Sequence, residues 1–240
     1  MRLPFTRFGL PQVVIYPLLV CILMVALFLV LKPSLALIPL EVLLFLVLVW
    51  MLSFFRDPLR IIIPDENVLY SPADGTITDI DEVDGSVLGY ADQNSDGKPV
   101  RVQRIGMFLS VFNVHINRVP CSVRIEKVTY KKGQFKNAMS PESSRINESN
   151  DIIMTRLLAP QDRLLVRQVS GAIARRIVCE AQATAEYRQG EPFGMIKFGS
   201  RTELYLPVGE GGEGKRTYDV AVKIGDRVRA GLTPLVRYRQ

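Results

Sequence analysis

Two long apolar runs open the chain and predict helices that cross a membrane. Residues 13–31 carry no charged side chain, and residues 34–55 carry only Glu41. Each run is long enough to cross a hydrocarbon layer of about 30 Å as a helix. Only Lys32 and Pro33 separate the runs, so we expect a tight transmembrane helical hairpin. No role is assigned to Glu41.

Cationic residues flank the hairpin at its two outer ends. Arg2 and Arg7 precede the first run, and Arg56 and Arg60 follow the second. Because positively charged flanks are typical of the cytoplasmic side of a membrane, we expect both outer ends on that side. The expected location of the chain is therefore the cell (inner) membrane.

These features divide the chain into two expected domains. Residues 1–55 form a membrane anchor, and residues 56–240 form a domain on the cytoplasmic side. An alternative interpretation is a signal peptide over residues 1–36, in which Ser34–Ala36 is a poor small-residue cleavage site. The second apolar run follows at once, which favours the anchor.

Beyond residue 55 the pattern changes to short runs in which apolar and polar residues alternate. A period of two is typical of half-buried strands, and turn pairs such as Asp74-Gly75 and Lys132-Gly133 between the runs favour hairpins. Residues 172–182 fit either a helix or a strand. The predicted strand regions are 75–83, 100–114, 122–130, 151–158, 163–171, 201–207 and 218–231.

The expected fold class is thus a mainly β (α+β) soluble domain behind a two-helix transmembrane hairpin. The tail at residues 222–235 resembles the strand–turn–strand pattern of lipoyl-type barrel-sandwich domains. It lacks the Met-Lys or Asp-Lys pair that carries a swinging cofactor, so we interpret the tail as barrel-sandwich-like architecture.

The charge distribution and the cysteine spacing limit which binding partners, disulfides and metal sites can be expected. The net charge of +6 comes mostly from dispersed basic residues, and no basic-aromatic nucleic-acid motif is present. We therefore expect no nucleic-acid partner, and the dispersed basic residues indicate either a solvated surface or a weak attraction to anionic lipid. Cys21, Cys121 and Cys179 lack CxxC or His-rich spacing, so neither a disulfide framework nor a metal site is expected.

Three polar features stand out in the β region. Asp74 lies in an Asp-Gly turn, His115 is the single histidine, and Gly199-Ser200 interrupts a strand-like run. Each has an ordinary structural explanation, namely a turn cap, a core histidine and a β-bulge. Together they supply a carboxylate, an imidazole and a hydroxyl, which suits activation of Ser200 as a nucleophile.

A serine hydrolase fits this set poorly. An α/β hydrolase places its serine in a G-x-S-x-G elbow between a strand and a helix, whereas Ser200 lies between two strand-like halves. The carbonyl group nearest to the hydroxyl in the chain belongs to Gly199. Attack of Ser200 on its own backbone is therefore the more attractive chemistry.

Five segments of the chain form a recognisable series of motifs. They are FFRDP (54–58), SPADG (71–75), FLSVFNVHINRVP (108–120), GEPFGMIKFGSR (190–201) and YLP (205–207). In these segments the chain resembles the phosphatidylserine decarboxylase proenzymes, in particular their short, membrane-anchored form. The resemblance covers nearly all of residues 54–207, and its motifs run in family order.

The resemblance implies that the precursor cuts itself between Gly199 and Ser200. The products are a large chain, residues 1–199, and a small chain, residues 200–240, whose first residue becomes a covalent pyruvoyl group. That group is the implied cofactor, and it decarboxylates phosphatidylserine to phosphatidylethanolamine through a Schiff base. A glycine suits position 199 because it leaves the carbonyl uncrowded and tolerates strained backbone.

The chain departs from its longer bacterial relatives in one motif. They carry two histidines in Y-H-R-V-H-x-P, whereas this chain reads V-H-I-N-R-V-P, with Arg118 at the second position. That second histidine is usually assigned to self-cleavage. Either His115 serves both cleavage and decarboxylation, which we favour, or cleavage relies on Asp74 and strain.

The resemblance also implies further site residues and partners. Phe112, Asn113, Arg118 and Phe198 are candidates for the substrate pocket. The partners are a membrane phospholipid and the two chains of one precursor, and a homo-oligomer is left open. Two alternatives stand beside this lyase: a membrane-anchored serine hydrolase using Ser200, His115 and Asp74, and a non-enzymatic barrel-sandwich adaptor.

Overall fold

The structure is a computed structural model that describes residues 4–31, 37–90, 100–139, 142–172, 176–197, 199–208 and 217–239. The chain divides into two compact units, Met1–Leu59 and Arg60–Gln240. The first unit is helical, and the regular elements of the second are strands apart from two short helical turns in its described part.

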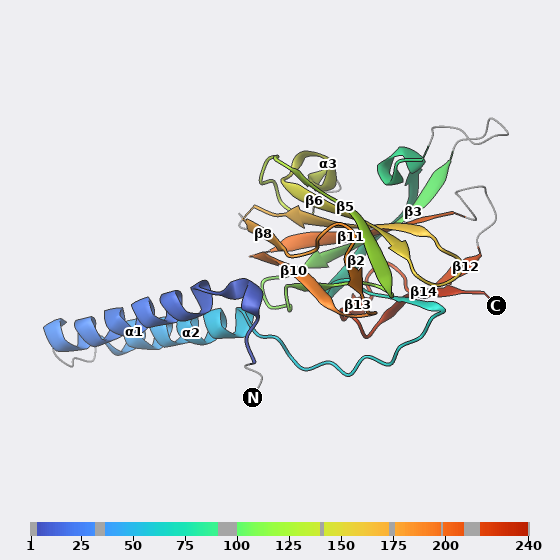
Figure 1. Ribbon diagram of the computed structural model, residues 1–240. Coiled ribbons are helices and arrows are strands. Elements are labelled where there is room, and N and C mark those ends of the chain that lie inside the picture. The colour runs from blue at the N-terminus through green and yellow to red at the C-terminus, as the bar shows by residue number, and fades with distance from the viewer. Residues whose placement is uncertain are drawn as a thin grey trace. The chain divides into compact units, whose positions relative to one another are not determined.

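The helical unit consists of a short 3-10 turn and two apolar helices that lie side by side (Figure 1). The turn η1 spans Arg7–Gly9, α1 spans Gln12–Leu31 and α2 spans Ile38–Phe54. The open end is closed by a backbone hydrogen bond of 2.9 Å from Thr6 N to Phe55 O. Most of the large apolar side chains on both helices are exposed.

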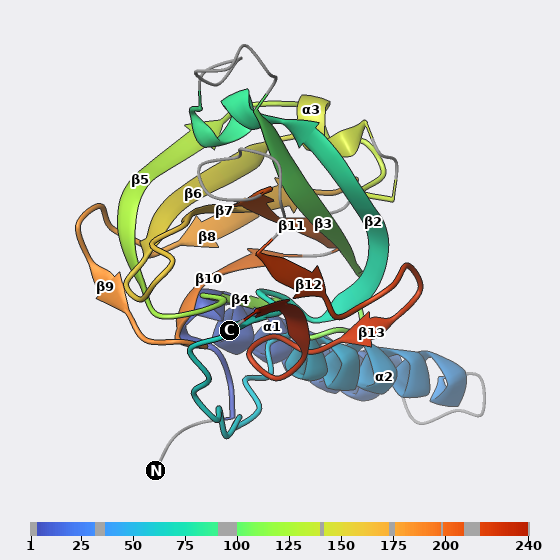
Figure 2. The same cartoon turned by 90° about the vertical axis from the view of Figure 1, so that its right-hand side faces the viewer.

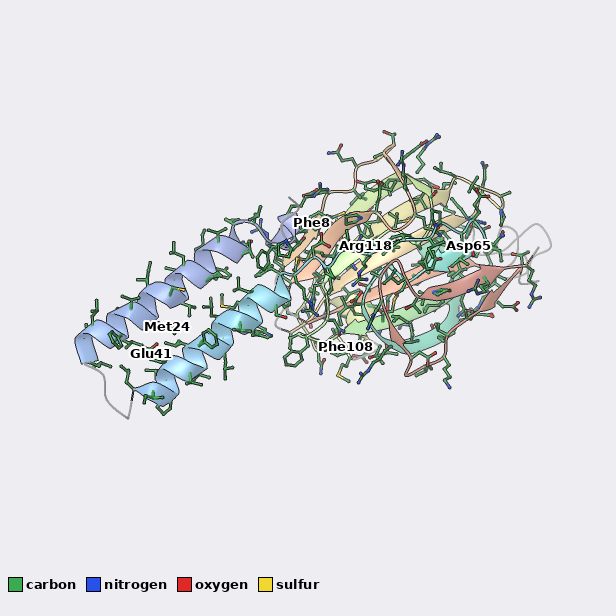
Figure 3. The ribbon with its side chains drawn as sticks, turned by 90° about the horizontal axis from the view of Figure 1, so that it is seen from below. Phe8, Met24, Glu41, Asp65, Phe108 and Arg118 are labelled. Atoms are coloured by element: carbon green, nitrogen blue, oxygen red, sulfur yellow. The ribbon has the colours of Figure 1, made fainter. Side chains whose placement is uncertain are left out.

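One helix of the described chain, Gln12–Leu31, is long and apolar enough to cross a membrane, and it begins near the N-terminus. The second predicted span is shorter than expected, since α2 has 17 residues. A paired crossing therefore stays a prediction. Figure 3 shows Met24 of α1 and Glu41 of α2 between the two helices. Residues 32–36, which include the predicted turn, lie outside the described residues.

The second unit contains one large antiparallel sheet and two small ones. The large sheet has eight strands in the order β13-β2-β3-β11-β7-β6-β5-β9 and curls into a half-barrel (Figure 2). Its strands are β2 Gly75–Asp84, β3 Arg101–Leu109, β5 Val123–Lys131, β6 Ser149–Arg156, β7 Arg163–Ser170, β9 Glu186–Tyr187, β11 Ser200–Pro207 and β13 Arg227–Val228.

The two small sheets have three strands each, in the orders β1-β14-β12 and β4-β10-β8. Two short helical turns, η2 Gly85–Leu88 and α3 Ser143–Ile146, complete the unit. The strands of the small sheets are β1 Val68–Tyr70, β4 Ile116–Arg118, β8 Arg176–Cys179, β10 Pro192–Lys197, β12 Tyr218–Val220 and β14 Pro234–Tyr238.

The core lies where strands of the large sheet and side chains from the small sheets pack together. Leu204 and Leu206 of β11 and Phe193 of β10 are among its fully buried members. A separate cluster containing Leu88 of η2 and Tyr205 of β11 covers the other face of the large sheet. β11 is therefore buried on both faces along its whole length.

The prediction of a mainly β domain is confirmed, and each predicted strand region contains at least one strand. The ambiguous region 172–182 forms a strand, β8, within its described part. The tail 222–235 does form strand–turn–strand, with β13 and the start of β14, but these two strands belong to different sheets. The structure thus confirms a mainly β fold with a curled sheet, and the finer expectation of a barrel-sandwich arrangement stays a prediction.

Candidate active site

The interruption at Gly199 marks a change of sheet. β10 lies in the sheet β4-β10-β8 and ends at Lys197, while β11 begins at Ser200 in the centre of the eight-stranded sheet. Gly199 has a φ of 67°, in the left-handed region that favours glycine. The chain therefore passes from one sheet to the other through the predicted cleavage point, instead of forming a bulge within one strand.

Ser200 is completely buried, with 0% of its surface exposed. Its neighbours in the sheet are Leu109 on β3 and Ser170 on β7. Among the residues that the structure describes, the Ser200 Oγ has no hydrogen-bond partner. Burying an unpaired hydroxyl costs about 1–3 kcal/mol, so this atom is an exception that calls for a chemical explanation.

The strand pairing places a second serine directly against Ser200. Ser170 donates its backbone N–H to Glu148 O at 2.9 Å, on the side of β7 away from β11. Ser170 and Ser200 therefore form a non-hydrogen-bonded pair, in which opposing side chains lie closest. The Ser170 Oγ is also buried without a hydrogen-bond partner in the described part of the chain. Two fully buried hydroxyls thus lie on paired residues of neighbouring strands, and neither is hydrogen-bonded to the other.

Gly171 allows a close approach to the carbonyl of Gly199. A Cβ atom at position 171 would lie 2.3 Å from Gly199 O and 3.2 Å from the Ala138 Cβ. Real Cβ contacts are not that short, so a side chain at 171 would displace the Gly199 peptide or its own strand. A Cβ atom at Gly199 itself would lie 3.9 Å from the Val111 Cγ1, an ordinary van der Waals contact.

His115 is buried, and its backbone is bonded to β10 close to the cleavage point. Ile196 N donates to His115 O at 3.2 Å. The His115 Nδ1 lies 3.0 Å from Asn113 O, and because a carbonyl oxygen only accepts, Nδ1 carries the hydrogen. The Nε2 atom is then the basic nitrogen of the neutral ring.

Asp74 is held by partners other than His115. Arg60 donates two hydrogen bonds to its carboxylate, at 2.7 and 2.8 Å, and Ala230 N donates a third at 2.8 Å. The Arg60 side chain is 5% exposed, so its guanidinium forms this ion pair largely shielded from solvent. The predicted orientation of His115 by Asp74 has no support in these contacts and stays a prediction.

The candidate pocket residues fall into different environments. Phe112 is 72% exposed, whereas Arg118 is buried and donates to Gly190 O at 3.0 Å. Figure 3 shows Arg118 within the β unit. The Asn113 side chain accepts from Ser110 N and Ser110 Oγ at 2.8 Å each and shapes the turn before His115. Phe198 lies outside the described residues.

A chain of buried polar side chains joins the two sheets beside Ser200. Asn117 of β4 donates to Thr202 Oγ1 on β11 at 3.0 Å, and Gln168 of β7 donates to Asn117 Oδ1 at 2.9 Å. Asn150 of β6 then donates to Gln168 Oε1 at 3.2 Å. These bonds fix β4, which follows His115, against the strands that surround Ser200.

The opposite face of β11 carries a dense ionic network. Arg201 donates to Glu203 Oε1 and Asp79 Oδ2 at 2.6 Å each, and Tyr205 Oη donates to Glu203 Oε2 at 2.5 Å. Burial and the Glu203 charge raise the pKa of Tyr205. Burial opposes ionisation of Asp79, but hydrogen bonds from Thr78 and Arg201 outweigh it and lower the pKa of that carboxyl.

Sequence patterns did not identify Ser170, Gly171 or Arg60 as neighbours of the candidate residues. Ser170 and Gly171 end an alternating strand, where a Ser-Gly pair is an ordinary turn signal. Their position against Gly199 and Ser200 depends on the pairing of β7 with β11, which no local pattern specifies.

Comparison with known proteins places this arrangement in a family. Residues 47–235 match the family model for phosphatidylserine decarboxylase. The chain is 39% identical over 241 residues to a "Phosphatidylserine decarboxylase proenzyme" of Rhodopirellula baltica, covering 99% of this chain and 90% of that protein. It is 40% identical to proteins of the same name from Pelagibacter ubique, covering 79% and 80%, and Carboxydothermus hydrogenoformans, covering 83% and 85%.

The matched residues include the site described above. Ser200 is buried without a hydrogen-bond partner in the described structure, follows a left-handed glycine and lies where the chain changes sheets. The chain belongs to the phosphatidylserine decarboxylase family. It is a decarboxylase, that is, a carbon–carbon lyase.

Proposed function

We propose that the chain is a precursor that cuts itself between Gly199 and Ser200 and then decarboxylates phosphatidylserine to phosphatidylethanolamine. The observation that carries the proposal is the Ser200 hydroxyl, which is buried without a partner in the described structure and follows a glycine with a φ of 67°. The names of the relatives, which call them proenzymes, support a precursor.

In the cleavage reaction, Ser200 Oγ attacks the carbonyl carbon of Gly199, and His115 Nε2 accepts the hydroxyl proton. The peptide C–N bond breaks, its nitrogen takes up a proton, and an ester joins the two residues. Residue 200 then loses its Cα proton, and the carboxylate of Gly199 leaves. The resulting dehydroalanine tautomerises to an imine, and water replaces its nitrogen, releasing ammonia and leaving a ketone.

The described residues fit such a group at position 200. Gly171 leaves room for the Gly199 carbonyl, and Ser170 places a hydroxyl beside the first residue of the small chain. When formed, the pyruvoyl group supplies a carbonyl that accepts an amine and withdraws electrons from the bond to a carboxylate. His115 delivers a proton to the product carbon, because imidazole exchanges protons near neutral pH. His115 thus serves both reactions.

Asp74 remains part of the proposed mechanism, as a residue that positions the site instead of orienting His115 directly. Its contacts with Arg60 and Ala230 tie the segment before β2 to the segment after β13. Pro72 O accepts from Arg118 N at 2.9 Å, so this segment also packs against β4. Asp74 therefore acts by holding these segments beside His115. Phe112, Asn113, Arg118 and Phe198 remain proposed pocket residues.

The two cleavage products stay together as one enzyme. The small chain, residues 200–240, contributes β11, which pairs along its length with β3 and β7 of the large chain, residues 1–199. The Arg201–Asp79 ion pair of 2.6 Å also joins the two chains. This pairing supports the proposed partnership of both fragments.

The apolar N-terminal unit supports a membrane location. The helix Gln12–Leu31 has the length and composition of a span, and we propose that α2 crosses beside it, so that residues 1–55 anchor a catalytic domain, residues 56–240, on the cytoplasmic side of the cell membrane. Anchoring restricts the search for a diacyl lipid to a surface and raises its effective concentration.

Intact mass spectrometry tests the proposal. The purified protein should separate under denaturing conditions into fragments of residues 1–199 and 200–240, and the small fragment should lack a free amino group and react with hydrazine. Release of carbon dioxide from phosphatidylserine should accompany the small fragment. An unbroken chain labelled at Ser200 by a phosphonylating probe would instead support a serine hydrolase.

A further inference from the structure

One loop beside the cleavage point combines exposed apolar side chains with lysines. The loop at residues 132–139, here named the rim loop, follows β5 and reads KGQFKNAM. Its Phe135 is 42% exposed and its Met139 is 59% exposed, while Lys132 and Lys136 are also exposed. The loop contains no acidic residue.

The backbone of the rim loop is firmly held. Lys136 N donates to Asn147 Oδ1 at 2.9 Å, and Asn147 Nδ2 donates to Lys136 O at 2.8 Å. Gln134 N donates to Ile146 O at 2.7 Å, and Gln134 O accepts from Glu148 N at 3.0 Å. The exposed side chains therefore project from a fixed frame.

The same frame attaches the rim loop to the active site. Asn147, which is fully buried, also donates to Ser170 O at 2.8 Å, and Ser170 lies opposite Ser200. Ala138 is the buried residue of the loop, and its Cβ lies 3.2 Å from where a Gly171 Cβ would be. The rim loop thus lies directly beside the proposed cleavage peptide.

The charge around the rim loop favours an anionic partner. Acidic residues nearby are Glu142, which is exposed, and Glu148, which is 7% exposed and accepts from Tyr130 Oη at 2.9 Å. Lys131 extends the cationic segment at the end of β5 and donates to Arg145 O. Apolar side chains flanked by lysines are typical of segments that lie in the interface of an anionic bilayer.

We propose that the rim loop docks on an anionic phospholipid surface, with Phe135 and Met139 in the interface and Lys132 and Lys136 against lipid phosphates. This inference rests on the proposed function and names the surface from which its substrate enters. Ser200 is fully buried, and the acyl chains of a lipid stay in the bilayer, so the site must meet the interface for a headgroup to reach it.

Tryptophan fluorescence tests the docking directly. The chain has one tryptophan, so Trp50→Phe provides a silent background for Phe135→Trp in the full-length protein. In vesicles containing brominated phosphatidylserine, the fluorescence of the Phe135→Trp protein should fall by about half relative to unbrominated vesicles. No quenching at this position would overturn the inference.

Leu158 offers a matched control for that experiment. It is 39% exposed, close to the 42% of Phe135. Leu158 lies between β6 and β7, at the end of the sheet opposite Ser170, and a strand of this length separates the two ends by roughly 25 Å. Leu158→Trp in the same background should show little quenching, and equal quenching at both positions would contradict a specific docking surface.

Turnover provides a second test. Lys132→Gln/Lys136→Gln should reduce turnover of phosphatidylserine in dilute anionic vesicles about twentyfold, since each lysine near an anionic surface contributes roughly fivefold to binding. Turnover of a short-chain, water-soluble phosphatidylserine should change less than twofold. Equal losses with both substrates would place the lysines in folding or catalysis and contradict docking.

A charge-matched control separates docking from overall charge. Arg101→Gln/Arg124→Gln removes the same charge at the far end of β3 and β5, and vesicle turnover should fall less than twofold. Failure of self-cleavage in the unmodified protein would contradict the proposed function, while the fluorescence test would still report docking independently.

Discussion

The two faces of β11 bury polar groups in opposite ways. On one face, Arg201, Glu203 and Tyr205 form a network in which the charged groups are paired. On the other face, the first hydroxyl of the strand, Ser200, has no partner in the described structure and faces the equally unpaired Ser170. Adjacent residues of one strand thus serve different purposes.

The comparison shows how a reactive group is kept in a stable sheet. A buried charge needs partners, because its desolvation is costly, and the Arg201 network meets that need next to the cleavage point. An unpaired hydroxyl costs less, and it retains the freedom to attack a carbonyl. The paired face therefore holds the strand, while the unpaired face carries the proposed chemistry.

The largest expected effect comes from removing the unpaired hydroxyl. Ser200→Ala should leave the chain unbroken and reduce decarboxylation at least about a thousandfold, the scale on which loss of a nucleophile acts. A denaturing gel and carbon dioxide release measure the two effects. Full decarboxylation by the alanine variant would remove the basis of the proposed function.

Breaking the paired face should affect stability. Glu203→Leu removes one of the two carboxylates that lie 2.6 Å from the buried guanidinium of Arg201, leaving Asp79, and should lower the free energy of unfolding by about 3 kcal/mol. Urea unfolding of the detergent-solubilised protein measures the loss. The fraction that folds should still cleave, and a folded variant that never cleaves would assign Glu203 to the reaction itself.

A methyl group at position 171 should separate cleavage from folding. Gly171→Ala places a Cβ 2.3 Å from Gly199 O and should slow self-cleavage about a hundredfold, since misplacing reacting atoms by about 1 Å has that cost. The half-time of cleavage of freshly synthesised chain measures the effect.

Gly85→Ala is the control for that change. The new Cβ at position 85 would lie 2.7 Å from the Val100 Cγ1. We expect overpacking to lower the free energy of unfolding by about 1–3 kcal/mol in each of the two glycine variants. Cleavage should keep the unmodified rate. Equal slowing in both variants would show that general destabilisation, and not displacement of Gly199, controls cleavage.

The smallest expected effect comes from the second hydroxyl. Ser170→Ala removes the polar neighbour of Ser200. The two hydroxyls form no hydrogen bond in the described structure, but we expect Ser170 to supply one as Ser200 attacks, and its loss should slow cleavage about fivefold, the effect of a neutral hydrogen bond of roughly 1 kcal/mol. Ser170→Thr keeps the hydroxyl and should restore most of the rate. No difference between the two variants would limit Ser170 to packing.

The sequence by itself determined the local features of this protein. Apolar runs, alternation with a period of two and turn pairs predicted the helices and strands, because each depends on neighbouring residues only. The motifs around Asp74, His115 and Gly199-Ser200 also identified the family before any contact was known. Region 172–182 stayed ambiguous, since so short a run suits a strand as well as a helix.

The tertiary structure decided which of these residues meet. The order of the sheet places β11 between β3 and β7, and that order brings Ser170 and Gly171 to the cleavage point and the rim loop beside them. The tertiary structure also pairs Asp74 with Arg60 in an ion pair, and the described contacts of Asp74 do not include His115. Pairing across strands is set by register and by contacts distant in sequence, and a local pattern carries no record of either.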